Sequence, residues 1–212
     1  MAEALNKLAL SRSYQVFRAG VWDENPIFRQ ILGICSALAV TNLVINTGVM
    51  CAGLVFVTAC SNVTVSALRH YTPRRIRMIV QTLIIAAYVI IFKSGLDAYL
   101  PDISDQLGAY VGLIITNCII MGRAEGFAAS NPLWPSFVDG MGSGIGYSVI
   151  LLVIAFFREL MGMGTLCGMK VLGDWWLPWT IMVMPAGAFF GLALVVWFGR
   201  RLSTPPSTEQ KK

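Results

Sequence analysis

Residues 31–68 read ILGICSALAVTNLVINTGVMCAGLVFVTACSNVTVSAL, 38 consecutive residues without a charged side chain. One helical crossing of a bilayer takes about 20 apolar residues. Two full crossings with a turn between them would need more than this run offers, so we predict two crossings, at least one of them short. Turn-forming residues at 42–48 place the predicted crossings at about 27–43 and 48–68.

Four more crossings are predicted along the rest of the chain, at about 76–96, 106–122, 141–161 and 176–199. The crossing at 106–122 has only 17 uncharged residues and is again short. Pro185 is expected to break the last crossing, because proline removes a helical hydrogen bond. Polar loops are predicted over Arg123–Asp139 and Gly162–Asp174.

The composition agrees with a membrane protein. The chain of 212 residues is 56% hydrophobic and 13% charged, whereas soluble domains carry about 25% charged residues. Its net charge of +5 fits basic loops on one side of a membrane, so nucleic acid is not expected as a partner. Residues 1–30 lack the apolar core of a cleavable signal peptide. We therefore predict an all-α integral membrane protein with a crossing domain at 26–199 and cytoplasmic tails at 1–25 and 200–212.

The basic residues predict the orientation. With six crossings, 13 of the 16 Lys and Arg residues fall on the side that holds both termini. The other side holds Lys93, Arg158 and Lys170. Because cytoplasmic loops carry the excess of basic residues, both termini are predicted to be cytoplasmic.

The order of the crossings suggests an internal repeat. Residues 26–100 and 104–199 would each contain three crossings, in opposite orientations, and each set begins with a short crossing that carries a cysteine. Inverted repeats with broken helices that meet near the midplane have this layout. The fold expected is two inverted three-helix repeats whose first helices are short or broken.

Cys35 and Cys118 are the candidate metal ligands. Each lies about four residues from the cytoplasmic end of its uncharged stretch, so both thiols are expected at a similar depth, closer to the middle if the helices are broken. Thiolates suit iron–sulfur clusters, zinc and copper(I), and an iron–sulfur cluster normally takes four thiolates. The missing ligands could come from Cys51 and Cys60, which are half a helical turn out of register, or from a partner subunit. The remaining alternative is a pair of inert buried thiols.

Several other features have competing interpretations. A boundary ion pair or a subunit contact is expected of Arg123 and Glu125. An ion pair at the other membrane boundary, or a lid on a cation path, is expected of Arg158 and Glu159. No acidic residue is expected deep within a crossing. Ser36, Thr116 and Asn117 are candidate hydrogen-bond donors to the thiolates. Further expectations are close helix packing at Gly142-xxx-Gly146 and Gly187-xxx-Gly191, an aromatic belt at Trp175, Trp176 and Trp179, and inert thiols at Cys51, Cys60 and Cys167.

Between about residues 25 and 199 the chain resembles the D subunits of the Na⁺-translocating NADH:quinone reductases. The stretches that carry the resemblance are Leu32–Thr41 (LGICSALAVT), Gly112–Glu125 (GLIITNCIIMGRAE), Pro135–Tyr147 (PSFVDGMGSGIGY) and Phe156–Leu160 (FFREL). The sister family, the E subunits of the Rnf complexes that couple ferredoxin and NAD⁺ to ion transport, is favoured by Arg69–Pro73 (RHYTP). A stand-alone transporter is a third hypothesis, suggested by the repeats alone.

The resemblance implies a function. Cys35 and Cys118 would bind an intramembrane [2Fe–2S] cluster together with two cysteines of a homologous E-type subunit. That cluster would relay electrons between flavins on opposite sides of the membrane, coupled to Na⁺ export. FMN, FAD and riboflavin would lie on other subunits (A, B, C and F among them), as would NADH oxidation and ubiquinone reduction. The location implied is the bacterial inner membrane, in contact with lipid.

Overall fold

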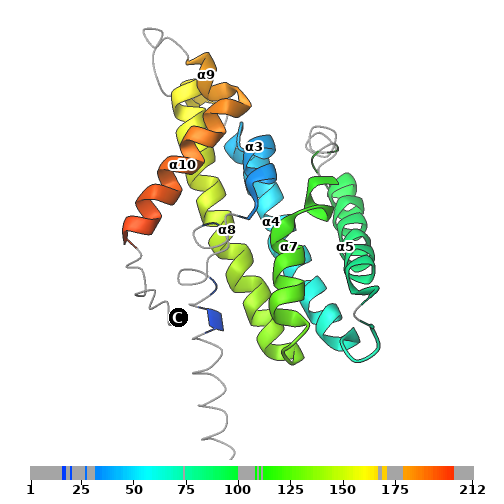
Figure 1. Cartoon of the computed structure of the whole chain (residues 1–212). Helices are drawn as coiled ribbons and strands as arrows, with labels where there is room; N and C mark the ends of the chain where they lie inside the picture. The colour runs from blue at the N-terminus through cyan, green and yellow to red at the C-terminus, as the bar shows by residue number, and fades with distance from the viewer. Residues whose placement is uncertain are drawn as a thin grey trace, which may run out of the picture.

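The computed structural model describes residues 16–17, 20, 27, 32–73, 75–99, 108, 110, 112–166, 169–170 and 179–202. Within these ranges the chain forms a helical bundle (Figure 1). Most of the two predicted tails, the predicted start of the first crossing and two of the three belt tryptophans, Trp175 and Trp176, lie outside the described residues.

The first half contains the short helix α3 (Ile34–Val40) and the long helices α4 (Val44–Leu68) and α5 (Arg77–Tyr99). The prediction of a short first helix is confirmed for its described part. The turn that follows α3 is shorter than predicted, because α4 already begins at Val44. The Val44 N–H donates to Glu159 Oε2 at 2.7 Å, which satisfies one of the amides that a helix N-terminus leaves open.

The second half contains a broken helix. Residues 112–115 are helical, the helix is interrupted at Thr116–Asn117, and α7 (Cys118–Arg123) continues into the π-helical segment η2 (Ala124–Ala128). The predicted break in this crossing is confirmed. The long helix α8 (Leu133–Gly162) follows, then two short strands, β1 (Thr165–Leu166) and β2 (Met169–Lys170), paired antiparallel. The last helices are α9 (Thr180–Val183) and α10 (Pro185–Leu202), separated at Met184 as the proline predicted.

The predicted loop at Arg123–Asp139 is wrong. η2 occupies part of it, and α8 begins eight residues before the crossing predicted at 141. Pro135 is compatible with this helix because it lies in the first turn, where its missing N–H would have no helical partner. Asp139 is compatible with it because Arg123 pairs with its carboxylate.

α4 and α8 form the centre of the bundle and pack closely through small residues. A Cβ added to Gly140 would lie 3.0 Å from the Thr58 carbonyl oxygen, and one added to Gly144 would lie 3.2 Å from Val55 Cα. The predicted close packing is confirmed at Gly142, where an added Cβ would lie 3.1 Å from the Phe17 carbonyl oxygen, whereas the contacts of Gly140 and Gly144 with α4 were not predicted.

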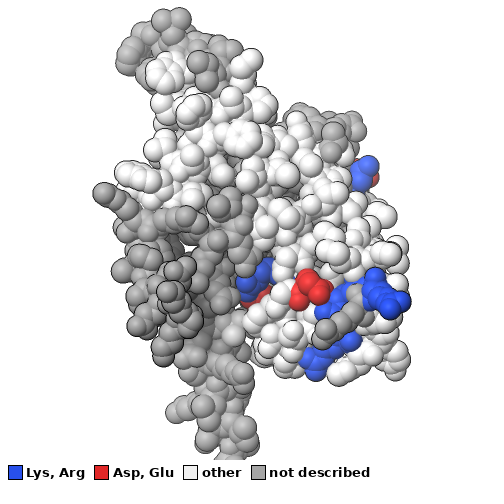
Figure 2. All heavy atoms as spheres, in the orientation of Figure 1, with Lys and Arg blue, Asp and Glu red and all other residues white. Residues whose placement is uncertain are grey.

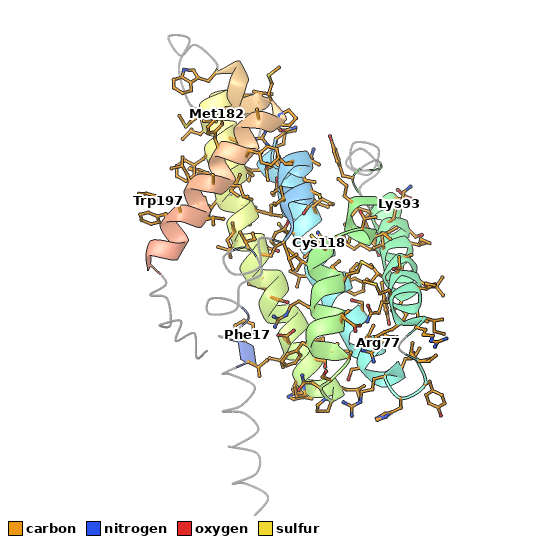
Figure 3. All side chains as sticks on the ribbon, viewed as in Figure 1. Phe17, Arg77, Lys93, Cys118, Met182 and Trp197 are labelled. Carbon is orange, nitrogen blue, oxygen red and sulfur yellow. The ribbon has the colours of Figure 1, made fainter. Side chains whose placement is uncertain are left out.

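Within the described ranges, α4, α5 and α8 are long and apolar enough to cross a membrane, and residues 185–199 of α10 form a shorter apolar helix. On the face shown in Figure 2, charged side chains cluster near the start of α5, a smaller group lies near its other end, and the surface between is uncharged. Figure 3 locates these two ends by Arg77 and Lys93. The described part of the chain is thus a helical membrane bundle with one small hairpin, and the count of six crossings stays a prediction.

Candidate metal centre

Cys35 and Cys118 lie at the beginnings of two short helices that meet. Cys35 is in the first turn of α3 and is exposed, and Cys118 is the first residue of α7 and is half-buried. The Gly33 N–H donates to Cys118 Sγ at 3.1 Å. In Figure 3, Cys118 lies where α7 begins, beside α3. The structure therefore brings the two cysteine-bearing turns together, although 83 positions separate them in the chain.

Gly33 is the residue on which this contact depends. Its φ of 86° and ψ of 16° lie in the left-handed region, where residues with a side chain are disfavoured. A Cβ at this position would lie 2.6 Å from Ile119 Cδ1 and 2.7 Å from Tyr147 Cε2. Conformation and space both require glycine here, and this lets the backbone amide approach the sulfur.

Asn117 connects the break before α7 to α3. Its Oδ1 accepts a hydrogen bond from the Ile119 N–H at 3.1 Å and so caps α7. Its Nδ2 donates to Ser36 Oγ at 3.3 Å. Both side chains were predicted as donors to the thiolates, but here they bond to each other, and the donor to Cys118 Sγ is a backbone amide.

Tyr147 of α8 completes this network. Its side chain is fully buried, its hydroxyl donates to the Gly33 carbonyl at 2.8 Å, and it shares a short hydrogen bond with the Ser36 hydroxyl. Tyr147 was not among the predicted site residues. Its only signal in the sequence is its place at the end of the glycine-rich stretch 140–147.

Arg123 and Asp139 form a buried ion pair at a different height along α8 from this network. Arg123 Nε donates to Asp139 Oδ2 at 3.0 Å, and a second contact joins Nη2 to Oδ1. The side chains are 7% and 1% exposed. Asp139 is therefore a buried carboxylate at a position predicted to end a loop, and the expected pairing of Arg123 with Glu125 is wrong. Glu125 instead accepts from Arg77 at 2.9 Å and from Gln81 at 2.8 Å, which ties η2 to α5.

Arg158 and Glu159 are buried and do not pair with each other, contrary to the predicted boundary pair. Arg158 donates to Thr41 Oγ1 at 2.5 Å, at the end of α3. It also donates at 3.1 Å to three carbonyls beside the break before Pro185, those of Met182, Val183 and Met184. Glu159 accepts from the start of α4. The two charges thus satisfy backbone groups at helix ends, which a bilayer interior requires of the protein itself.

α8 contacts these elements at three heights. At 1.5 Å per residue, Tyr147 lies about 12 Å along the helix from Asp139 and about 17 Å from Arg158. The sum, about 29 Å, matches the thickness of the hydrocarbon core. α3 runs from the height of Tyr147 toward Thr41, which bonds to Arg158 at one end of the bundle. α7 and η2 run from the same height in the opposite direction, toward Glu125, which bonds to Arg77 at the other end. Figure 1 shows the same opposite directions.

The described residues contain no group of three or more His, Cys, Asp and Glu side chains that could bind a metal ion. The Cys51 thiol donates to the Ser148 carbonyl at 3.7 Å, and both Cys51 and Cys60 line an apolar groove of about 610 Å³ between α4 and α8. Cys167 lies outside the described residues. In this part of the chain, Cys35 and Cys118 thus form an incomplete set of two thiols, one of them open to the surface.

Comparison with known proteins gives two findings. A family described as "Rnf-Nqr subunit, membrane protein" matches residues 13–196. A protein of Photobacterium profundum, named as the D subunit of the Na(+)-translocating NADH-quinone reductase, is 47% identical over 195 residues. That alignment covers 90% of this chain and 92% of the relative.

Proposed function

This chain belongs to the Rnf-Nqr family of membrane protein subunits, and from that premise we propose that it is the D subunit of a Na⁺-translocating NADH:quinone reductase. The support is its 47% identity, over almost the full length of both chains, to a protein of that name. As such a subunit it takes part in electron transfer from NADH to ubiquinone coupled to Na⁺ transport, with NADH oxidation and quinone reduction on other subunits.

Within that complex, Cys35 and Cys118 would hold one half of an intramembrane [2Fe–2S] cluster. The observation that carries this proposal is the meeting of the two cysteine turns, seen in the hydrogen bond from the Gly33 N–H to Cys118 Sγ. The donor set fits, because such a cluster takes thiolates and an N–H donor favours a negatively charged sulfur. The cluster would supply one-electron chemistry, and the chain's own contribution would be two thiolates, one exposed and one half-buried, on turns that contact each other.

A homologous E-type subunit is proposed to supply the other two thiolates. A four-thiolate cluster is not complete on the described residues, and Cys35 is exposed, so the missing ligands must approach from the Cys35 face. The flavins FMN, FAD and riboflavin are assigned to the other subunits of the complex.

The proposed arrangement in the bacterial inner membrane has six crossings in two inverted repeats and both termini in the cytoplasm. The opposite directions of α3 and α7 from the level of Tyr147 support it. So does the concentration of Arg69, Arg75 and Arg77 near the end of the bundle where α7 and η2 finish.

Replacement of each cysteine in turn tests the metal site. Cys35→Ala and Cys118→Ala are each expected to abolish the EPR signal of the intramembrane cluster and to remove two iron and two sulfide ions per purified complex. Cys51→Ala is the matched control, since Cys51 is also a thiol inside the bundle but bonds to the Ser148 carbonyl. An unchanged signal in both site variants would overturn the proposal.

The alternative is an E-type subunit of an Rnf complex, since the family name covers both complexes. It keeps the cysteine pair and changes the electron donor. NADH:quinone reductase activity of the purified complex supports the first assignment, and ferredoxin-dependent reduction of NAD⁺ supports the second.

A further inference from the structure

Tyr147 lies at the point where the two cysteine turns join, and no function has yet been attached to it. Its hydroxyl contacts the Gly33 carbonyl and the Ser36 hydroxyl. Ser36 is the neighbour of Cys35, and it also accepts from Asn117, the neighbour of Cys118. One buried hydroxyl on α8 therefore contacts, directly or through one side chain, the residues next to both thiols.

The protons of this network can be counted. The hydroxyls of Tyr147 and Ser36 carry one proton each, and both lie within hydrogen-bond distance of the Gly33 carbonyl, at 2.8 Å and 3.1 Å. One hydroxyl donates to that carbonyl while the other donates across the Tyr147–Ser36 contact. Either arrangement keeps the Gly33 carbonyl bonded and leaves Ser36 Oγ open to accept from Asn117.

The position of Gly33 determines the hydrogen bond to the sulfur. The Gly33 N–H reaches Cys118 Sγ at 3.1 Å only while its residue stays in the left-handed conformation. The Tyr147 hydroxyl holds the carbonyl of the same residue, and its ring lies against the position where a Gly33 Cβ would be. The Tyr147 hydroxyl and ring thus hold the Gly33 turn from two sides. The hydrogen bonds of the hydroxyl go to Gly33 and Ser36 and not to a sulfur.

We propose that Tyr147 is a positioning residue of the cysteine pair, and that by holding the Gly33 turn it raises the reduction potential of the group the two thiols bind. Reduction by one electron adds negative charge, and a hydrogen bond donated to a ligating sulfur stabilises the more negative state. The low dielectric of the buried network strengthens this bond and couples its members. The inference rests on the proposed function above, because it requires that Cys35 and Cys118 bind a redox group.

The test is a redox titration of the purified complex, followed by the EPR signal of the cluster, in the wild type and in Tyr147→Phe. Phenylalanine keeps the ring and removes only the hydroxyl. The expected result is a lower potential, with a roughly tenfold fall in the equilibrium constant for one-electron reduction, which corresponds to about 59 mV. The g-values are expected to change as well, since the orientation of the Cys118 sulfur changes.

The matched control is Tyr88→Phe. The Tyr88 hydroxyl bonds to Thr64 Oγ1 at 2.7 Å between α5 and α4, so it is also a tyrosine–hydroxyl pair within the bundle. Its removal is expected to leave potential and g-values unchanged. A purely structural role for buried tyrosine hydroxyls would affect the stability of both variants but would not shift the potential of one of them.

Ser36→Ala is the second variant, and it decides the matter if Tyr147→Phe does not assemble. It is expected to lower the potential as well, because the Ser36 hydroxyl shares the hydrogen bond with Tyr147 and accepts from Asn117 beside Cys118. An unchanged potential and spectrum in Tyr147→Phe, or in Ser36→Ala where the first variant is lost, overturns the inference.

Cys35→Ala in the same series separates this inference from the proposed function. If the signal is lost in Cys35→Ala while Tyr147→Phe behaves as wild type, only the role of Tyr147 is overturned. If the signal survives in Cys35→Ala, the metal assignment fails and this inference fails with it.

Discussion

Replacing Gly33 with alanine should disrupt the cysteine pair while leaving both cysteines in place. The left-handed conformation costs a residue with a Cβ about 1–2 kcal/mol. The new Cβ would also lie 2.6 Å from Ile119 Cδ1 and 2.7 Å from Tyr147 Cε2, and overpacking of this kind costs about 1–3 kcal/mol. The free energy of unfolding is therefore expected to fall by about 2–5 kcal/mol in total, unless the turn moves.

Movement of the turn would relieve the clash, but it would also take the Gly33 N–H away from Cys118 Sγ. Either response should lower the iron and sulfide content of the purified complex and its temperature of thermal unfolding. Gly48→Ala is the matched control, because a Cβ at this helical position meets nothing within 4 Å, and alanine is favoured over glycine inside a helix. Wild-type iron content and stability in Gly33→Ala would refute the geometry described for this turn.

Two further outcomes follow from the buried charges and the topology. Asp139→Leu leaves the Arg123 guanidinium buried without its carboxylate, so it should destabilise the complex by about 3–5 kcal/mol. The double variant Arg123→Met with Asp139→Leu should recover much of that stability in thermal unfolding of the purified complexes. Equal destabilisation of the single and double variants would contradict the pairing. To test the topology, cysteines can be introduced at the exposed positions Arg75 and Lys93. Arg75→Cys should react with a membrane-impermeant maleimide added on the cytoplasmic side, and Lys93→Cys with one added on the opposite side. Reaction of both from the same side would contradict the predicted orientation.

Apolar length and helix-breaking residues made much of the bundle predictable. α4 and α5 follow from uncharged runs, and the helix breaks before α7 and before α10 follow from a run of 17 residues and from Pro185. These features depend on local sequence, because a bilayer demands a minimum apolar length and proline cannot continue a helix without a kink.

The errors concern charges whose partners are distant in the chain. Arg123 and Asp139 looked like the ends of a polar loop when each was considered alone, but together they are a neutral buried pair. Arg158 and Glu159 looked like partners because they are adjacent, although each bonds to a different element. Sequence spacing carries no information about such tertiary partners, and the length of α8 was underestimated for that reason.

The two cysteines of the candidate site were selected from the sequence, but the residues that surround them were not. Cys35 and Cys118 were selected through their placement and a family resemblance, and their role as metal ligands stays a prediction. The contact of Gly33 with Cys118 and the hydroxyl of Tyr147 are products of three chain segments that meet only in the fold. A glycine near one cysteine and a tyrosine at the end of a glycine-rich stretch have no distinctive pattern of their own.

The most direct measurement of the central claim is iron-edge anomalous diffraction from crystals of the assembled complex. We expect an anomalous peak within bonding distance of Cys35 Sγ and Cys118 Sγ, on the exposed side of Cys35 and against a neighbouring subunit. An iron peak at Cys51 and Cys60, or the absence of iron beside Cys35 and Cys118 in an active complex, would contradict it.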